Sequence, residues 1–251
     1  IKEKFILITA GSVHSLPAMM PVESQLILKS SKVLHWYTQN HDGTAPEKIS
    51  PLPLGMDFHT IHRRECWGIK QLPVRKQNEV LEMIRAQLPP FDKRKKALYM
   101  DSQFACRNDP ELVGAANDLT RSELFENIKN DPAVYVQQHF LPQFEMWVRR
   151  GQFTHVLSHH GAGLDCHRTW EALVLGHVLV VQKSSLDPLY EDLPVIIVDD
   201  WAEVAVAGVD QILKKGTNEI YRRQKLTNRY WIDKMREHAE LALHGEEDMQ
   251  A

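Results

Sequence analysis

The sequence contains few cysteines and no long apolar run. Its 251 residues include only Cys66, Cys106 and Cys166. This odd, widely spaced set argues against a disulfide framework, so we expect reduced thiols in a reducing, cytoplasmic compartment. No apolar stretch approaches the roughly 20 residues that a membrane-spanning helix needs, and no signal peptide begins at Ile1. We therefore expect no integral membrane segment, while an anchor outside these residues stays open.

The charge balance gives no global attraction to polyanions. The chain has 30 Lys and Arg against 33 Asp and Glu, a net charge of −3. Neither nucleic acid nor an anionic membrane would be attracted to the molecule as a whole, so we expect no nucleic-acid partner. Hydrophobic residues make up 43% and charged residues 25%, which is ordinary for a globular protein.

Several catalytic motifs are also missing. The sequence has no Walker loop, no G-x-G-x-x-G, no H-E-x-x-H, no paired C-x-x-C and no G-x-S-x-G. Four histidines and one cysteine nevertheless crowd into thirteen positions: His155, His159, His160, Cys166 and His167. Because their spacing matches no convergent ligand set, we predict no metal site there.

Strands and helices are predicted to alternate along the whole chain. Short apolar runs predict strands at 5–10, 33–37, 49–54, 97–100, 134–137, 155–158, 178–181 and 195–198. Helices are predicted at 24–29, 77–87, 111–116, 120–129, 142–149, 165–175, 202–214 and 219–238, and a loop is expected after the strand 49–54. The proline pair at 89–90 and the basic run at 93–96 predict a boundary. We expect an α/β fold with two Rossmann-like domains, at 1–92 and 93–251, the last helix packing back on the first domain.

The most informative stretch is 154–181, which predicts strand, glycine-bearing turn, helix and strand. The turn contains Gly161 and Gly163, which let the backbone approach a ligand closely. Asp165 is predicted to cap the following helix. At the carboxyl edge of an open sheet, such a turn and helix start favour an anionic ligand. Arg168 and Glu171 share a helix face, which offers either a phosphate cation and a sugar-binding carboxylate or an exposed ion pair.

Three sequence blocks carry a family resemblance. The block from Ser158 to Leu173, with Gly176 after it, resembles the donor-binding segment of exostosin-like glycosyltransferases. The closest likeness is to short forms of algae and of large algal DNA viruses. The blocks 187–201 and 54–60 fit the same group. The sequence departs from the family pattern at His159, where proline is frequent, and at 177–178.

The resemblance implies a GT-B fold, in which two Rossmann-like domains face each other across a cleft. It implies an inverting transfer, without a metal or other cofactor, from a UDP-sugar to a glycan or glycoprotein hydroxyl. UDP-xylose is the donor we favour. The residues expected to bind the donor are Arg107, Ser158, His159, His160, Gly161, Gly163, Asp165, Arg168 and Glu171. For Arg107, a solvated loop arginine is an equal alternative.

Asp57 and His59 are the predicted catalytic residues. They follow a first-domain strand, and a carboxylate or imidazole near the acceptor hydroxyl is what a general base requires. We prefer Asp57. The bland alternatives are that Asp57 caps a turn and that His59 is structural.

Two other functions stay open at this point. One is transfer from another UDP-hexose or a UDP-uronic acid. The other is a nucleotide- or glycan-binding module without catalysis.

Overall fold

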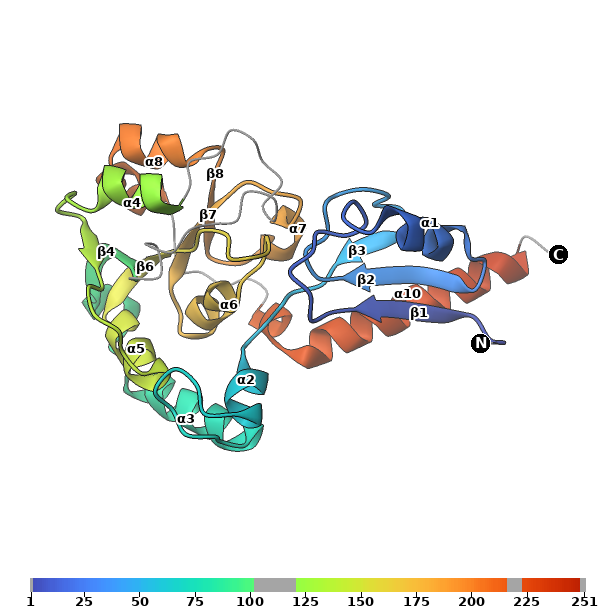
Figure 1. The fold of residues 1–251 in the computed structure, drawn as a ribbon, viewed down its shortest axis with the longest axis horizontal. Helices are drawn as coiled ribbons and strands as arrows, with labels where there is room; N and C mark the ends of the chain where they lie inside the picture. Colours follow the sequence, from blue (N-terminus) through green and yellow to red (C-terminus); the bar gives the residue numbers. More distant parts are fainter. Residues whose placement is uncertain (1, 102–120, 216–222, 249–251) are drawn as a thin grey trace.

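The computed structural model describes residues 2–101, 121–215 and 223–248. Within them the chain forms two parallel β-sheets flanked by helices (Figure 1). The predicted α/β class is therefore confirmed. The eight predicted strands all occur, with ends that differ from the prediction by a few residues at most.

The first sheet has three strands in the order β1-β2-β3. They are β1 (Phe5–Thr9), β2 (Val33–Thr38) and β3 (Ile49–Pro51), with α1 (Pro21–Lys29) between the first two. The strand β3 lies at the sheet edge, where a proline is tolerated because no ladder hydrogen bond is lost. Buried apolar side chains of this unit include Leu16, Val33, Trp36 and Ile49.

The second sheet has five strands in the order β5-β4-β6-β7-β8. Every residue of β6 and β7 is buried, as expected for central parallel strands covered on both faces. One face packs on α4, α8 and α9, and the other packs on α6. The bounds are β4 (Lys95–Met100), α4 (Arg121–Ile128), β5 (Val134–Val136), β6 (Phe153–Leu157), α6 (His167–Val174), β7 (Val178–Gln182), β8 (Val195–Val198), α8 (Trp201–Ala207) and α9 (Val209–Lys215).

The chain leaves the first sheet after β3, well before the predicted boundary at residue 93. Residues 52–57 cross to α2 (Phe58–Arg63) and α3 (Val74–Gln87), which lie beside α5 (Gln143–Arg150) in Figure 1. An apolar cluster joins Leu81 and Ile84 of α3 to Trp147 of α5. The 3-10 turn η1 (Phe91–Lys93) then leads into β4.

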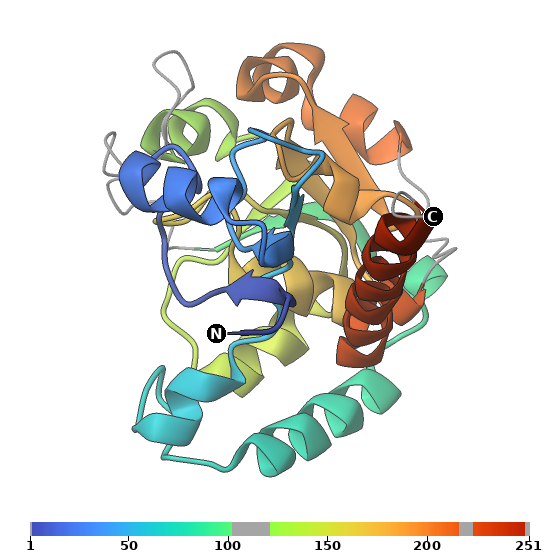
Figure 2. The ribbon, with the colours of Figure 1, turned by 90° about the vertical axis from the view of Figure 1, so that its right-hand side faces the viewer.

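The last helix returns to the first sheet. The 3-10 turn η3 (Arg223–Leu226) precedes α10 (Asn228–Asp248), which runs along β1 and β2 (Figures 1 and 2). The Tyr37 hydroxyl and His238 Nδ1 are 2.7 Å apart across this contact. No helix among the described residues is long and apolar enough to cross a bilayer.

Some predicted helices differ from the structure. The segment 58–63 is helical where a loop was expected, because the Asp57 side chain accepts the Thr60 N–H and caps it. The predicted helix 202–214 is divided into α8 and α9 by Gly208, whose φ is 77°. A short helix, α7 (Asp187–Tyr190), was not predicted. The predicted helix 111–116 lies outside the described residues.

Candidate functional site

The predicted glycine turn, residues 159–163, lies at the carboxyl end of β6 and meets loops of the first sheet. A side chain on Gly163 would come within 2.9 Å of the Val13 carbonyl and of Asn40. The Asn40 side chain also accepts the Asp165 backbone N–H at 2.8 Å. Because Val13 and Asn40 follow β1 and β2, loops from the carboxyl ends of both sheets converge here. Gly163 is thus needed for close backbone approach, although the neighbour is protein.

Asp165 does not cap α6, so this prediction was wrong. The N-cap is Cys166, without a side-chain cap bond. The buried Asp165 carboxylate instead accepts the Leu54 N–H at 2.7 Å and the Trp170 Nε1–H at 2.9 Å. Burial raises its pKa to about 6, against the lowering effect of these donors. These hydrogen bonds of Asp165 therefore hold residues 52–57 against α6.

The other polar residues of the turn point inward. Ser158 Oγ is 2.8 Å from Thr169 Oγ1. His159 is 2% exposed and stacks on Trp201 with ring centroids 5.2 Å apart. His160 Nδ1 is 3.0 Å from the Leu164 carbonyl, which fits a ring that braces the turn. These contacts give Ser158, His159 and His160 structural partners; donor binding by them stays a prediction.

Behind the turn lies a buried charge network of four residues: Asp101, Arg150, Arg168 and Glu171. Arg168 Nε is 3.3 Å from Asp101 Oδ2, and Arg150 Nη1 is 3.2 Å from Glu171 Oε2. Arg150 Nη2 joins the two pairs at 3.9 Å from Asp101. Among the described residues, two carboxylates thus face two guanidinium groups, so the charges of these four side chains balance. The Asp101 carboxylate raises the pKa of Arg168 against the lowering effect of burial.

This network excludes the exposed ion pair that was one alternative for Arg168 and Glu171. It also bears on the other alternative, in which the two residues bind phosphate and sugar. Arg168 and Glu171 do not form an exposed ion pair, since their side chains are 10% and 6% exposed. Glu171 also accepts the Gln143 Nε2–H and the Trp147 Nε1–H, at 2.7 and 3.1 Å. Its carboxylate therefore holds α5 against α6, and a contact with ribose stays a prediction. Arg107 lies outside the described residues.

Asp57, His59 and His167 form a second polar group, here called the Asp57 cluster. His59 Nδ1 is 2.8 Å from Asp57 Oδ1, and His167 Nε2 is 3.7 Å from Asp57 Oδ2. His167 Nδ1 is 2.7 Å from the Gly55 carbonyl. The His59 side chain is 58% exposed, so the cluster opens to solvent. The cluster offers a proton acceptor, or three ligand atoms that all lie within 4.8 Å of one another.

Sequence reasoning found Asp57 and His59 but missed that His167 joins them. His167 stands 110 positions away in the chain, and it was grouped with its sequence neighbours His155, His159 and His160. Only the crossing of residues 52–57 past α6 brings the three side chains together. The Gly55 and Leu54 contacts with α6 fix that crossing.

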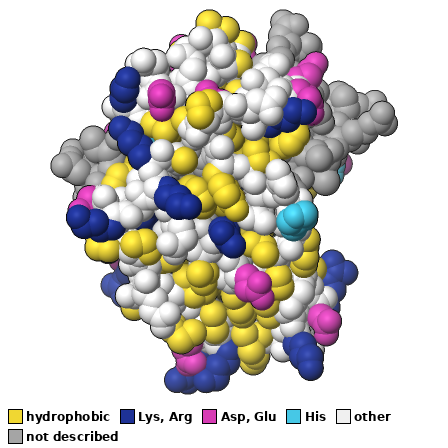
Figure 3. All heavy atoms as spheres, turned by 90° about the vertical axis from the view of Figure 1, so that its left-hand side faces the viewer, with side chains coloured by type: hydrophobic (Ala, Val, Ile, Leu, Met, Phe, Trp, Pro, Cys, Tyr) yellow, Lys and Arg dark blue, Asp and Glu magenta, His cyan; other side chains and the backbone are white. Residues whose placement is uncertain are grey.

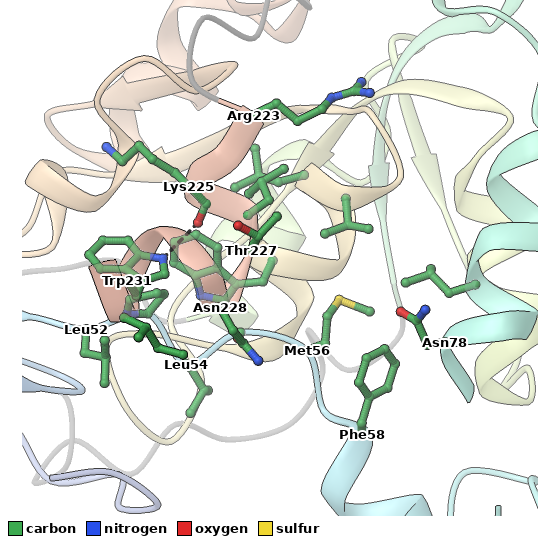
Figure 4. A pocket seen from close by; sticks show the side chains of 18 of the residues that line it. Leu52, Leu54, Met56, Phe58, Asn78, Arg223, Lys225, Thr227, Asn228 and Trp231 are labelled. Carbon is green, nitrogen blue, oxygen red and sulfur yellow. Dashed lines mark hydrogen bonds between the residues drawn. The ribbon is translucent and has the colours of Figure 1, made fainter. Parts of the chain in front are cut away.

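A cavity of about 680 Å³ lies between residues 52–58, α3, α6 and α10 (Figure 4). Met56 and Phe58 lie on one side of it and Trp231 on another, and Trp170 also lines it. Among the described residues, none of the predicted site residues lines this cavity. Its lining is mainly apolar but includes the basic residues Arg85, Arg223 and Lys225.

The described residues on the face formed by α3, α4 and α5 include both basic and acidic side chains. Figure 3 shows this face, where basic and acidic side chains are interspersed with hydrophobic ones. Among the described residues of this face, such mixing leaves no extended basic stripe of the kind that binds a nucleic-acid backbone.

Comparison with known proteins yields no assignment. No family model matches the chain, and no curated protein matches it significantly.

Proposed function

We propose that this protein is a GT-B glycosyltransferase that moves a sugar from a UDP-sugar to a glycan hydroxyl with inversion and without a metal. UDP-xylose is the donor we favour. The observation that carries the proposal is the convergence of loops from the carboxyl ends of both parallel sheets around the turn 159–163. Open α/β sheets bind their ligands at this edge.

In this proposal the donor pyrophosphate binds near the start of α6. Backbone N–H groups and the guanidinium of Arg168 would stabilise the negative charge that develops on the leaving UDP. Since Arg168 already pairs with Asp101, a phosphate there would share the guanidinium, which has five donors.

Asp57 is the proposed general base. Its side chain is 5% exposed, and the cluster reaches solvent through the His59 side chain, which is 58% exposed. It would accept the proton of the acceptor hydroxyl as the hydroxyl oxygen forms its bond to the anomeric carbon and the bond to UDP breaks. Exposed His59 would orient Asp57 or the acceptor.

A nucleotide-binding module without transfer activity is the second candidate. The observation in its favour is that Arg168 and Glu171 are both engaged by protein partners. The two candidates differ in turnover. The module would bind a UDP-sugar and yield neither transfer nor donor hydrolysis across a broad acceptor panel.

Release of UDP from a panel of UDP-sugars and glycan acceptors, measured in excess chelator, tests the proposal. We expect turnover to persist, because basic groups and backbone dipoles take the place of a metal at the leaving group. Activity that chelator abolishes and manganese restores would overturn the metal-independent mechanism.

A further inference from the structure

We propose that the Asp57 cluster is a binding site for a divalent transition-metal ion of the zinc type. Its three ligand atoms come from two separate segments. Asp57 precedes α2 and His59 lies in it, and His167 is the first residue of α6. The three atoms lie within 4.8 Å of one another without any rearrangement. Zinc–ligand bonds of about 2.0–2.2 Å separate neighbouring ligand atoms of a tetrahedral site by about 3.4 Å. His59 Nδ1 is 2.8 Å from Asp57 Oδ1, and His167 Nε2 is 3.7 Å from the other carboxylate oxygen, Oδ2. These separations lie on either side of that value.

The orientation of His167 is that of a metal ligand. A carbonyl oxygen can only accept, so the 2.7 Å contact with Gly55 places a proton on Nδ1. In the neutral ring, Nε2 then turns a lone pair toward a carboxylate oxygen of Asp57. Two acceptors that face each other favour a cation between them. Ligating histidines commonly donate their other N–H to a backbone carbonyl in this way.

The capping role of Asp57 is compatible with a bound ion. Asp57 accepts the Thr60 N–H at 3.0 Å and the Thr60 hydroxyl at 2.9 Å. A carboxylate has about four lone-pair positions, and the two capping bonds and the 2.8 Å contact with His59 Nδ1 engage three of them. One position stays available on Oδ2, and one on Oδ1 becomes available when His59 Nδ1 binds the ion. The capping bonds thereby hold the carboxylate in place for the ion. Because His59 is largely exposed, its ring can adjust by rotation.

The donor set selects the ion. Two imidazoles and one carboxylate suit Zn²⁺, Co²⁺ or Ni²⁺, whereas Mg²⁺ and Ca²⁺ prefer sets made of oxygen alone. Three protein ligands leave a fourth position open to solvent. If Asp57 is the general base of the proposed transfer, Zn²⁺ would occupy its lone pairs and inhibit. Only this last consequence rests on the proposed function.

Calorimetric titration of the metal-stripped chain with Zn²⁺ tests the site without any activity assay. We expect one ion per chain at this site, and excess Mg²⁺ should not compete. Loss of residues that merely support a ligand costs about ten- to a hundredfold in affinity, so His59→Ala and His167→Gln should each lose more than about a hundredfold. The glutamine amide can still donate to the Gly55 carbonyl, which preserves the local fold.

His62→Ala is the matched control, because His62 is an exposed histidine of the same helix, α2. It should bind Zn²⁺ as the wild type does. With Co²⁺, visible d–d absorption should appear in wild type and His62→Ala and be lost in the two ligand variants. The proposal is overturned if wild type binds no Zn²⁺, or if folded His59→Ala and His167→Gln both bind it with unchanged affinity.

Discussion

Asp57 makes structural contacts and is also the proposed general base. It caps α2 through Thr60, and it lies against His59 and His167. Asparagine is an equally good N-cap residue, so exchanging the carboxylate for an amide separates the structural duty from proton transfer.

We therefore expect Asp57→Asn to fold normally and to bind UDP as the wild type does. Transfer should fall by about a hundredfold to ten-thousandfold, the usual cost of removing a general base. His59→Ala should be milder. Initial rates with circular dichroism as the folding control check this. An active Asp57→Asn enzyme beside an inactive, well-folded His59→Ala enzyme would exchange the two roles.

Glu171 is expected to act through stability. Glu171→Ala leaves the buried Arg150 with only the more distant Asp101 carboxylate, and breaking a buried pair costs about 3–5 kcal/mol. Chemical denaturation should show this loss. Glu79→Ala, which removes an exposed ion pair on α3, is the control and should leave the midpoint nearly unchanged. Unchanged stability of Glu171→Ala with weakened UDP binding would instead support the ribose contact.

At the residue scale, the sequence singled out individual side chains but did not predict which residues they contact. Asp165 stood out by its position before a helix, yet its partner Leu54 is 111 positions away. The partners of Glu171 lie on α5, more than twenty positions earlier. Such contacts depend on tertiary packing, which periodicity and spacing do not encode.

At the scale of elements, the strand β6 carries a histidine whose burial makes stability depend on pH. His155 is 2% exposed, and burial lowers its pKa to about 4, with Lys96 adding to the effect. The unfolded chain, with a pKa near 6.5, therefore binds more protons than the folded chain between these values. The stability conferred by neutral His155 is complete above about pH 6.5 and is lost as the pH falls toward 4.

Replacing His155 by glutamine should flatten this dependence. Between pH 6.5 and 4 the wild type should lose up to about 1.4 kcal/mol per pH unit relative to His155→Gln, the value of one proton per unit. Urea denaturation at a series of pH values gives the difference. Parallel curves for the two proteins would show that His155 is not held neutral. Burial also lowers the pKa of His35 to about 4 and raises that of Asp165 to about 6. Both groups are present in the wild type and in His155→Gln, so the difference between the two curves reports His155.

Elements were predictable where local signals were strong. The apolar run of β7 is typical of a buried strand in a parallel sheet, as the structure shows. The strand order β5-β4-β6-β7-β8 was not predicted. The failures were two short helices, α2 and α7, that were not predicted, and a break within a predicted helix. The helix α2 depends on the Asp57 cap within a segment rich in proline and glycine, and Gly208 ends α8 inside a continuous helical pattern.

At the scale of the whole molecule, loops that follow strands of the two sheets meet through polar contacts. Asn40 holds Asp165, and Ser185 Oγ donates to the His41 carbonyl, so loops after β2 meet loops after β6 and β7. The return of α10 to β1 and β2 links the units a second time. The sequence indicated two α/β series, but the crossing at 52–57 and the cavity beside it depend on this packing.

Binding of UDP most directly tests the central claim, a nucleotide-diphosphate donor site at the turn 159–163 and the start of α6. A ligand at a thousandfold over its Kd stabilises the fold by about 4 kcal/mol, so UDP or a UDP-sugar should raise the melting temperature. Arg168→Ala should weaken binding, and Arg149→Ala, which removes an exposed arginine of α5, should not. Absence of any shift in the wild type with UDP, UDP-sugars or other nucleotide diphosphates at millimolar concentration would contradict the proposal.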